Sequence, residues 1–233
     1  MTRSMHCLLL PGTLCDARLF TPMQVAWSEH GFAPPTSVGD LHLLTLGPLA
    51  WCQALLADAP PCFDVIGFSL GGLLALQLLA LAPQRVRRLV LVASNPLPAS
   101  VQHRTRVRAQ MAQWHAQGPQ STAEQMLQLA SPAASVEVLA QVQAMAAATP
   151  TAALAAQGEL NATRGDGLPA LAHWPGPLLL VSGADDPWCG ADKQQLMRSV
   201  RPDAQWCELP QTGHYLPLEQ PHVLARLTHA FLT

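Results

Sequence analysis

The chain has 233 residues, of which 49% are hydrophobic and 12% are charged, so it can bury a sizeable core and lacks the composition of a disordered protein. A formal net charge of -2 excludes the positive field that nucleic-acid binders and polybasic membrane-surface proteins use. No apolar run approaches the roughly 20 residues of a membrane span, and the run at 7–10 is too short for a secretory core. We therefore expect a cytoplasmic protein with no nucleic-acid or membrane partner.

Short apolar runs alternate along the chain with longer segments of helical periodicity. We predict strands at 7–10, 35–38, 63–68, 88–93, 178–182 and 205–209, and helices at 21–30, 47–58, 71–81, 192–200 and 217–232. This alternation predicts an α/β fold with a mostly parallel sheet and helices on both faces.

One stretch interrupts this alternation. From 97 to 174 the sequence is rich in Ala and Gln, has no strand-like run, and spaces Val107, Met111 and Trp114 as on a helix. Pro and Gly at both edges mark the ends of an insertion. We predict a helical cap at 97–174 inserted into a core formed by 1–96 and 175–233. A flexible linker is disfavoured because the apolar periodicity needs a surface to pack on.

The six cysteines lie far apart in sequence, with no C-x-x-C pair. Because a chain of this size has no need of disulfides, we expect reduced thiols. The sequence also has no His/Cys/Asp cluster with metal-ligand spacing and no phosphate-binding glycine loop. We therefore expect no metal and no cofactor.

A G-x-S-x-G pattern places Ser69 between Gly67 and Gly71. It follows the apolar run at 63–66 and precedes a strongly helical stretch at 73–81, which is the strand-turn-helix setting that exposes a nucleophilic serine. The small residues let the turn tighten, and the helix amino terminus places partial positive charge beside the hydroxyl. Ser69 is the candidate nucleophile.

A serine hydroxyl needs a base to take its proton and an acid to orient that base. His214 follows the predicted strand at 205–209 and its exit loop, and Asp185 and Asp186 lie just past the predicted strand at 178–182. Both carboxylates lie at the end of this strand, so position alone leaves open which of them is the acid. The chain order is nucleophile, acid, histidine.

These motifs resemble, in order and over nearly the whole chain, those of the α/β-hydrolases. Residues 8–16 resemble the first oxyanion loop, the turn at Ser69 resembles the nucleophile elbow, and the pair at 213–214 resembles the histidine loop. The spacing from Gly183 to Asp186 resembles the acid turn of the family, which favours Asp186 over Asp185. The resemblance implies a catalytic triad of Ser69, Asp186 and His214.

Two departures from the family pattern concern the first loop. Pro11-Gly12 stands where the family usually has His-Gly, but an oxyanion hole needs only backbone N–H groups, and the resemblance implies that Thr13 and Leu70 supply them. Because this loop begins at residue 11, we also expect a sheet trimmed at one edge.

The triad predicts a cofactor-independent serine hydrolase acting on a small-molecule carboxylic ester through an acyl-enzyme. Hydrolysis of a lactone, a thioester or a carbon–carbon bond next to a ketone by the same triad is an alternative. A non-catalytic binding protein is a further alternative, and it is disfavoured because a binder has no need of all three residues.

In its compact size the chain also resembles the carboxylesterases that cleave methyl esters of carrier-protein-bound acyl chains in biotin synthesis. Arg104 and Arg108 are four residues apart in the predicted cap and would share a helix face, with Arg106 turned away; a second basic run lies within 85–88. A solvated helix face is the plainer interpretation. The resemblance implies instead that this surface meets an acidic acyl carrier protein.

Overall fold

A single parallel sheet organises the fold. The computed structural model describes residues 6–233; the first five residues, which belong to the amino-terminal stretch considered above, lie outside the described residues. Six strands pair in the order β2-β1-β3-β4-β5-β6, and each neighbouring pair is parallel. The strands are β1 Cys7–Leu10, β2 Thr36–Val38, β3 Phe63–Phe68, β4 Val86–Val92, β5 Leu178–Gly183 and β6 Gln205–Leu209. The predicted α/β fold is confirmed.

The central strands are apolar at successive positions because both faces of the sheet are covered. All residues of β1 and β3 are buried. Neighbouring side chains of a strand point to opposite faces, so Cys7 and Leu9 pack into one half of the core while Leu8 and Leu10 pack into the other.

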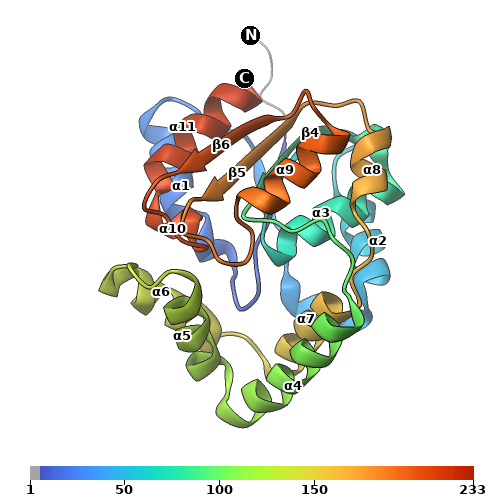
Figure 1. The fold of residues 1–233 in the computed structure, drawn as a ribbon. Coiled ribbons are helices and arrows are strands. Elements are labelled where there is room, and N and C mark those ends of the chain that lie inside the picture. The colour runs from blue at the N-terminus through green and yellow to red at the C-terminus, as the bar shows by residue number, and fades with distance from the viewer. Residues whose placement is uncertain (1–5) are drawn as a thin grey trace.

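Helices cover both faces of the sheet (Figure 1). They are α1 Thr21–Glu29, α2 Pro48–Asp58, α3 Leu70–Leu81, α4 Val101–Gln117, α5 Pro119–Ala130, α6 Val136–Ala147, α7 Thr151–Thr163, α8 Leu168–His173, α9 Ala191–Val200, α10 Leu216–Glu219 and α11 Pro221–Leu232, with short 3-10 helices η1 Ala17–Leu19, η2 Leu41–Leu46 and η3 Pro83–Arg85. Helices α1 and α11 pack together on one face, and α2, α3, α8 and α9 lie on the other. Within residues 6–233 no single helix has the length and hydropathy to cross a membrane. Helices α6 and α7 together meet both the length and the hydropathy criterion, but the pair is bent by 105° at its junction.

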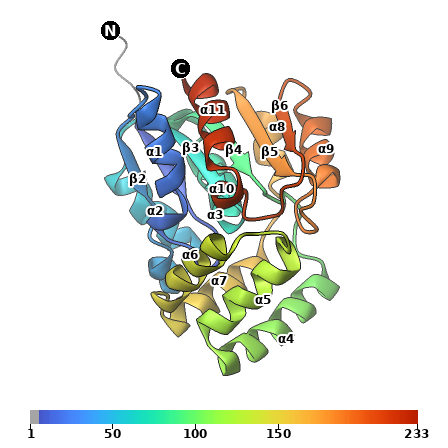
Figure 2. The same ribbon diagram turned by 90° about the vertical axis from the view of Figure 1, so that its left-hand side faces the viewer.

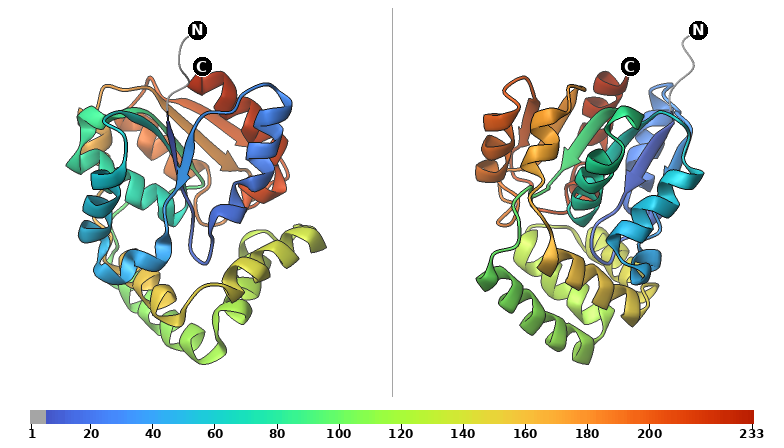
Figure 3. Two further views of the ribbon diagram at one scale, coloured as in Figure 1. Left: turned by 180° about the vertical axis from the view of Figure 1, so that it is seen from behind. Right: turned by 90° about the vertical axis from the view of Figure 1, so that its right-hand side faces the viewer.

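Four of the helices lie apart from the sheet. Helices α4, α5, α6 and α7 follow one another between β4 and β5 and form a layer at the carboxyl ends of the strands (Figures 1 and 2). Figure 3 shows the same layer from behind and from the other side. Helix α8, which also falls within 97–174, packs instead against α3 and α9 beside the sheet. The loops that leave β1, β3, β5 and β6 therefore open toward α4 to α7.

Candidate active site

Ser69 occupies the sharp turn between β3 and α3. Its backbone has φ 52° and ψ -111°, a region that non-glycine residues rarely adopt and that concentrates at functional sites. Its amide donates to the Val92 carbonyl at 2.9 Å. The turn is thus fixed by the neighbouring strand, and it places the hydroxyl beyond the carboxyl edge of the sheet.

The glycines around Ser69 are required because backbone segments meet there. A Cβ on Gly71 would lie 2.0 Å from the Leu10 carbonyl oxygen, and a Cβ on Gly67 would lie 2.7 Å from the Gly71 carbonyl oxygen. Helix α3 therefore begins in direct contact with the end of β1. This contact brings the loop after β1 beside the serine.

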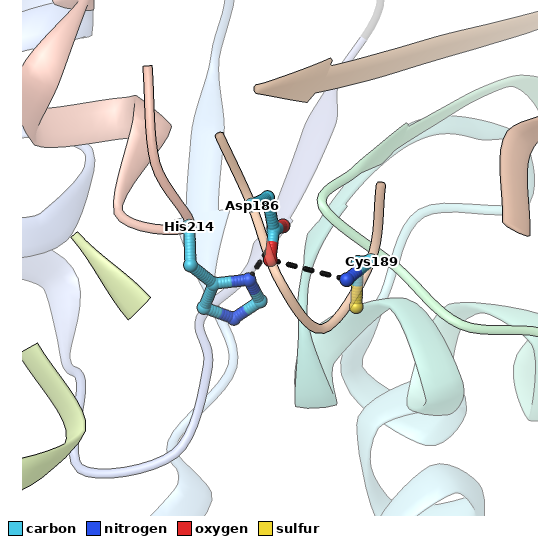
Figure 4. A group of neighbouring side chains, drawn as sticks. All are labelled: Asp186, Cys189 and His214. Atoms are coloured by element: carbon cyan, nitrogen blue, oxygen red, sulfur yellow. Dashed lines mark hydrogen bonds and ion pairs between the residues drawn. The ribbon is translucent and has the colours of Figure 1, made fainter. Parts of the chain in front are cut away.

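His214 and Asp186 meet Ser69 at this edge. The Ser69 Oγ lies 2.8 Å from His214 Nε2, and His214 Nδ1 lies 2.8 Å from Asp186 Oδ2. Asp186 Oδ1 accepts hydrogen bonds from the amides of Trp188 at 2.8 Å and Cys189 at 3.1 Å, and Figure 4 shows the carboxylate between the ring and the Cys189 amide. The structure therefore brings together the three side chains that the sequence singled out.

The charge of Asp186 fixes the tautomer of the histidine. Burial raises the pKa of this carboxyl, but the His214 ring and the two amide hydrogen bonds outweigh burial, and the pKa lies below its ordinary value. An ionised carboxylate only accepts hydrogen bonds, so Nδ1 of His214 carries a proton and Nε2 is free to accept from the Ser69 hydroxyl. This is the arrangement that general-base activation of a serine needs.

The histidine loop is held by α5, a contact that the sequence analysis did not predict. The His214 amide donates to the Ala130 carbonyl at 2.9 Å. The Ser131 hydroxyl donates to Glu219 Oε1 at 2.7 Å, and the Gly213 amide donates to Glu219 Oε2 at 2.8 Å. Ser131 and Glu219 are 88 residues apart, and nothing in the sequence indicates that they meet.

The sequence model of the alpha/beta hydrolase family matches residues 7–227. The chain belongs to this family. Among solved structures, this hydrolase is similar to an esterase from Thermogutta terrifontis, with a TM-score of 0.81 and 20% identity over 98% of this chain and 89% of that chain. It is also similar to MenH from S. aureus, with a TM-score of 0.80 and 16% identity over 100% of this chain and 94% of that chain. At these identities the likeness concerns the fold.

Curated relatives match this hydrolase over short stretches. The putative hydrolase LipZ of Mycobacterium tuberculosis is 38% identical over 63 residues, which are 27% of this chain and 22% of LipZ. The pimeloyl-[acyl-carrier protein] methyl ester esterase of Aromatoleum aromaticum is 49% identical over 47 residues, which are 20% of this chain and 19% of that protein. The aligned part thus spans about a fifth of these relatives.

The predicted oxyanion donors lie on the two loops beside Ser69. Thr13 and Leu70 line the same cavity as Ser69. Leu70 is the first residue of α3, so its amide has no partner within the helix. The neighbouring Leu14 has φ 58°, and its amide donates to the buried Gln157 Oε1 of α7 at 2.9 Å. The oxyanion role of Thr13 and Leu70 stays a prediction of the hydrolase family resemblance.

A cavity of about 570 Å³ lies above Ser69 and His214, between the loops and the α4–α7 layer. Its wall combines apolar side chains such as Val107, Trp114 and Leu129 with polar side chains of α4 and α7. Smaller hollows elsewhere on this hydrolase do not include the serine. Among these hollows, the cavity above Ser69 is therefore the candidate substrate site.

Cys189 lies next to Asp186 and His214 and adds a third potential metal ligand to theirs. Ligand atoms of Asp186, Cys189 and His214 lie within 4.8 Å of one another (Figure 4), a cluster that the sequence spacing did not indicate. Metal binding needs a thiolate, and burial, followed by the charge of Asp186, raises the pKa of the Cys189 thiol well above its ordinary value. The carboxylate and the imidazole already bind each other, so the group fits a triad better than a metal centre.

Proposed function

We propose that this hydrolase is a serine esterase that cleaves a carboxylic ester through an acyl-enzyme. The observation that supports the proposal is the continuous chain of hydrogen bonds, each of 2.8 Å, from the Ser69 hydroxyl through the His214 ring to the Asp186 carboxylate. A binding protein would have no need of this chain.

The geometry gives each residue one task. His214 Nε2 takes the hydroxyl proton while the Ser69 oxygen attacks the ester carbonyl, and Asp186 stabilises the imidazolium that forms. We assign the developing oxyanion to the amides of Thr13 and Leu70, which line the cavity beside Ser69. The imidazolium then gives its proton to the leaving alcohol. Water, activated by the same nitrogen, releases the acid from Ser69.

A fluorophosphonate probe tests this assignment directly. We expect it to label wild-type protein at Ser69 and to fail on Ser69→Ala, and we expect that variant to lose several orders of magnitude in turnover of p-nitrophenyl esters, since triad residues act as a unit. Ser121→Ala, an exposed serine of α5, is the matched control and should behave like wild type. Labelling at another serine, or turnover by Ser69→Ala, would contradict the proposal.

The same experiment separates the alternatives. A labelled Ser69 together with turnover of a lactone or a thioester, but of no ester, would keep the triad and change the bond that is cleaved. Absence of labelling in the folded protein would favour a binding protein on this fold.

A carrier-protein-bound ester is a second candidate substrate, favoured by the 49% identity to part of a pimeloyl-[acyl-carrier protein] methyl ester esterase. Arg104 is exposed on α4, and its guanidinium makes no ion pair within residues 6–233. Arg108, in contrast, pairs with Glu159 of α7 at 2.6 Å. Arg104 is therefore the sharper probe of an acidic partner.

A further inference from the structure

Two helices turn polar faces toward the nucleophile. Residues three or four apart share a helix face, and the cavity that contains Ser69 is lined by one such set from each of two packed helices, α4 and α7. The first set is His103, Arg106 and Gln110 of α4. The second is Gln157 and Asn161 of α7 with Arg164, which directly follows the last residue of that helix. Helices usually present their apolar stripe to the interior. A polar stripe on both helices at this position indicates a polar ligand.

The charge of this wall is positive. Arg106, Arg164 and Lys193 line the cavity, and no lining residue carries a carboxylate. Lys193 is paired with Asp192 at 2.6 Å, whereas Arg106 makes no hydrogen bond or ion pair with any described residue. Burial, followed by the charge of Arg164, lowers the pKa of His103 below its ordinary value, so that ring is neutral near pH 7.

Arg164 is fixed in place but keeps free donors. Its Nε donates to the Leu97 carbonyl at 2.9 Å, and its Nη1 donates to His103 Nε2 at 2.7 Å and to Asn161. Its Nη2 has no partner in residues 6–233. A guanidinium held on one side and open on the other is suited to binding a carboxylate, because its remaining N–H groups are already oriented.

Gln157 supplies an independent observation. This side chain is 1% exposed, and its Oε1 accepts from the Leu14 amide, which fixes the orientation of the amide group. Its Nε2 is therefore a buried donor, and it has no partner among the described residues. A buried donor without an acceptor is unfavourable, and a ligand oxygen in the cavity would satisfy it.

Gln157 also joins the polar stripes to the loop after β1. Its Oε1 accepts from the Leu14 amide, and the same loop carries Thr13, which lines the cavity together with Ser69. A substrate chain that lies along the stripes would therefore start beside this loop.

We propose that the substrate is a half-ester whose acyl chain ends in a carboxylate, which Arg106 and Arg164 bind while Gln157 Nε2 donates to a further oxygen of the chain. The inference rests on the proposed esterase function. It adds a specificity that the triad does not contain, because Ser69 and His214 act equally on a neutral acyl chain.

Matched nitrophenyl esters test the specificity. Mono-p-nitrophenyl adipate and p-nitrophenyl hexanoate have the same number of acyl carbons and differ in the terminal carboxylate. We expect wild-type kcat/KM to be higher for the adipate ester by about 10-fold or more, the effect of one or two charge-assisted hydrogen bonds. Suberate and octanoate esters extend the comparison to a longer chain.

Arg106→Gln should remove this preference, through a loss of about 10-fold in kcat/KM for the adipate ester, and leave the hexanoate ester within about 2-fold of wild type. Arg104→Gln is the matched control, since Arg104 lies on the same helix, is exposed and does not line the cavity. Equal kcat/KM for both esters in wild type, or equal effects of the two substitutions, would overturn the inference.

Binding to Ser69→Ala separates this inference from the esterase proposal. We expect calorimetry to show monomethyl adipate binding to Ser69→Ala, and about 10-fold weaker binding when Arg106→Gln is added. If no ester is cleaved but this difference is found, the anion site stands and the esterase proposal fails. If neutral esters are cleaved and monomethyl adipate binds neither variant, the esterase proposal stands and the anion site fails.

Discussion

Asp185 and Asp186 are adjacent in sequence but have opposite surroundings. Asp185 is exposed, and its amide donates to the Thr212 carbonyl at 2.9 Å. Asp186 is 5% exposed and accepts from the His214 ring and two amides. Because consecutive side chains in this turn point in different directions, one carboxylate reaches the imidazole and the other reaches water.

Asparagine substitutions at these two positions should therefore differ sharply. Asp186→Asn keeps the shape of the side chain but no longer requires a proton on His214 Nδ1, and we expect kcat for esters to fall by about 10⁴-fold. Asp185→Asn should stay within about 2-fold of wild type, because surface substitutions away from a site have small effects. Steady-state kinetics on a nitrophenyl ester decide it, and a larger loss in Asp185→Asn would show the assignment to be wrong.

The sequence alone could not choose between these carboxylates, since both follow the same strand; the family resemblance favoured Asp186. The site residues that lie in motifs could be predicted from the sequence, because a turn, a strand end and a short exit loop are local features. The contacts of Gln157 and Ser131 could not be predicted in this way. Their partners lie 143 residues away at Leu14 and 88 residues away at Glu219, and such contacts depend on where the α4–α7 layer sits over the sheet.

The buried cysteines should be unreactive in the native protein. Burial raises the pKa of Cys15 and Cys52 to about 12, and that of Cys189 well above its ordinary value, so at pH 8 these groups are thiols and not the reactive thiolates. We expect iodoacetamide to modify the partly exposed Cys62 and Cys207 first, with esterase activity retained. Mass spectrometry of native and guanidinium-unfolded protein measures this, and rapid native alkylation of Cys189 would contradict it.

Among the elements, the predicted boundaries are accurate where apolar periodicity is uninterrupted and wrong where a charged residue or a proline interrupts it. Strand β4 begins at Val86, two residues before the predicted start at 88, because Arg87 looks like loop sequence until its pairing with Asp64 at 2.6 Å is known. The predicted helix at 217–232 is two helices, α10 and α11, separated at Gln220. Pro221 disfavours helical geometry in the residue before it, and hydrophobic spacing does not reveal this.

The contact between α3 and β1 can be tested through its glycine. Gly71→Ala places a Cβ 2.0 Å from the Leu10 carbonyl oxygen, and because both partners are backbone we expect a loss of about 3 kcal/mol in the free energy of unfolding. Gly165→Ala is the control: nothing lies within 4 Å of its Cβ, so its effect should be within about 0.5 kcal/mol. Urea denaturation measures both, and similar stabilities would show that the start of α3 can shift.

At the scale of the whole molecule, most of the basic residues noted in the sequence serve the fold. Arg85 donates to three carbonyls at the end of α2 and in the loop that follows it, and Arg87 pairs with the buried Asp64. Arg88 donates to the Leu232 carbonyl at the carboxyl end of α11. Of Arg104 and Arg108, which share a face of α4, Arg108 pairs with Glu159 at 2.6 Å, and the exposed Arg104 makes no ion pair among the described residues.

An acyl carrier protein that docks on this face would make the reaction sensitive to salt. We expect kcat/KM for a carrier-protein-bound methyl ester to fall by about 10-fold in Arg104→Glu and to decrease as added salt screens the approach of the acidic partner. A nitrophenyl ester, which needs no docking, should show neither effect. Arg226→Glu on α11 changes the net charge equally and should leave both substrates unaffected. Equal sensitivity of the two substrates, or of neither, would eliminate the carrier protein and leave a hydrolase of small esters.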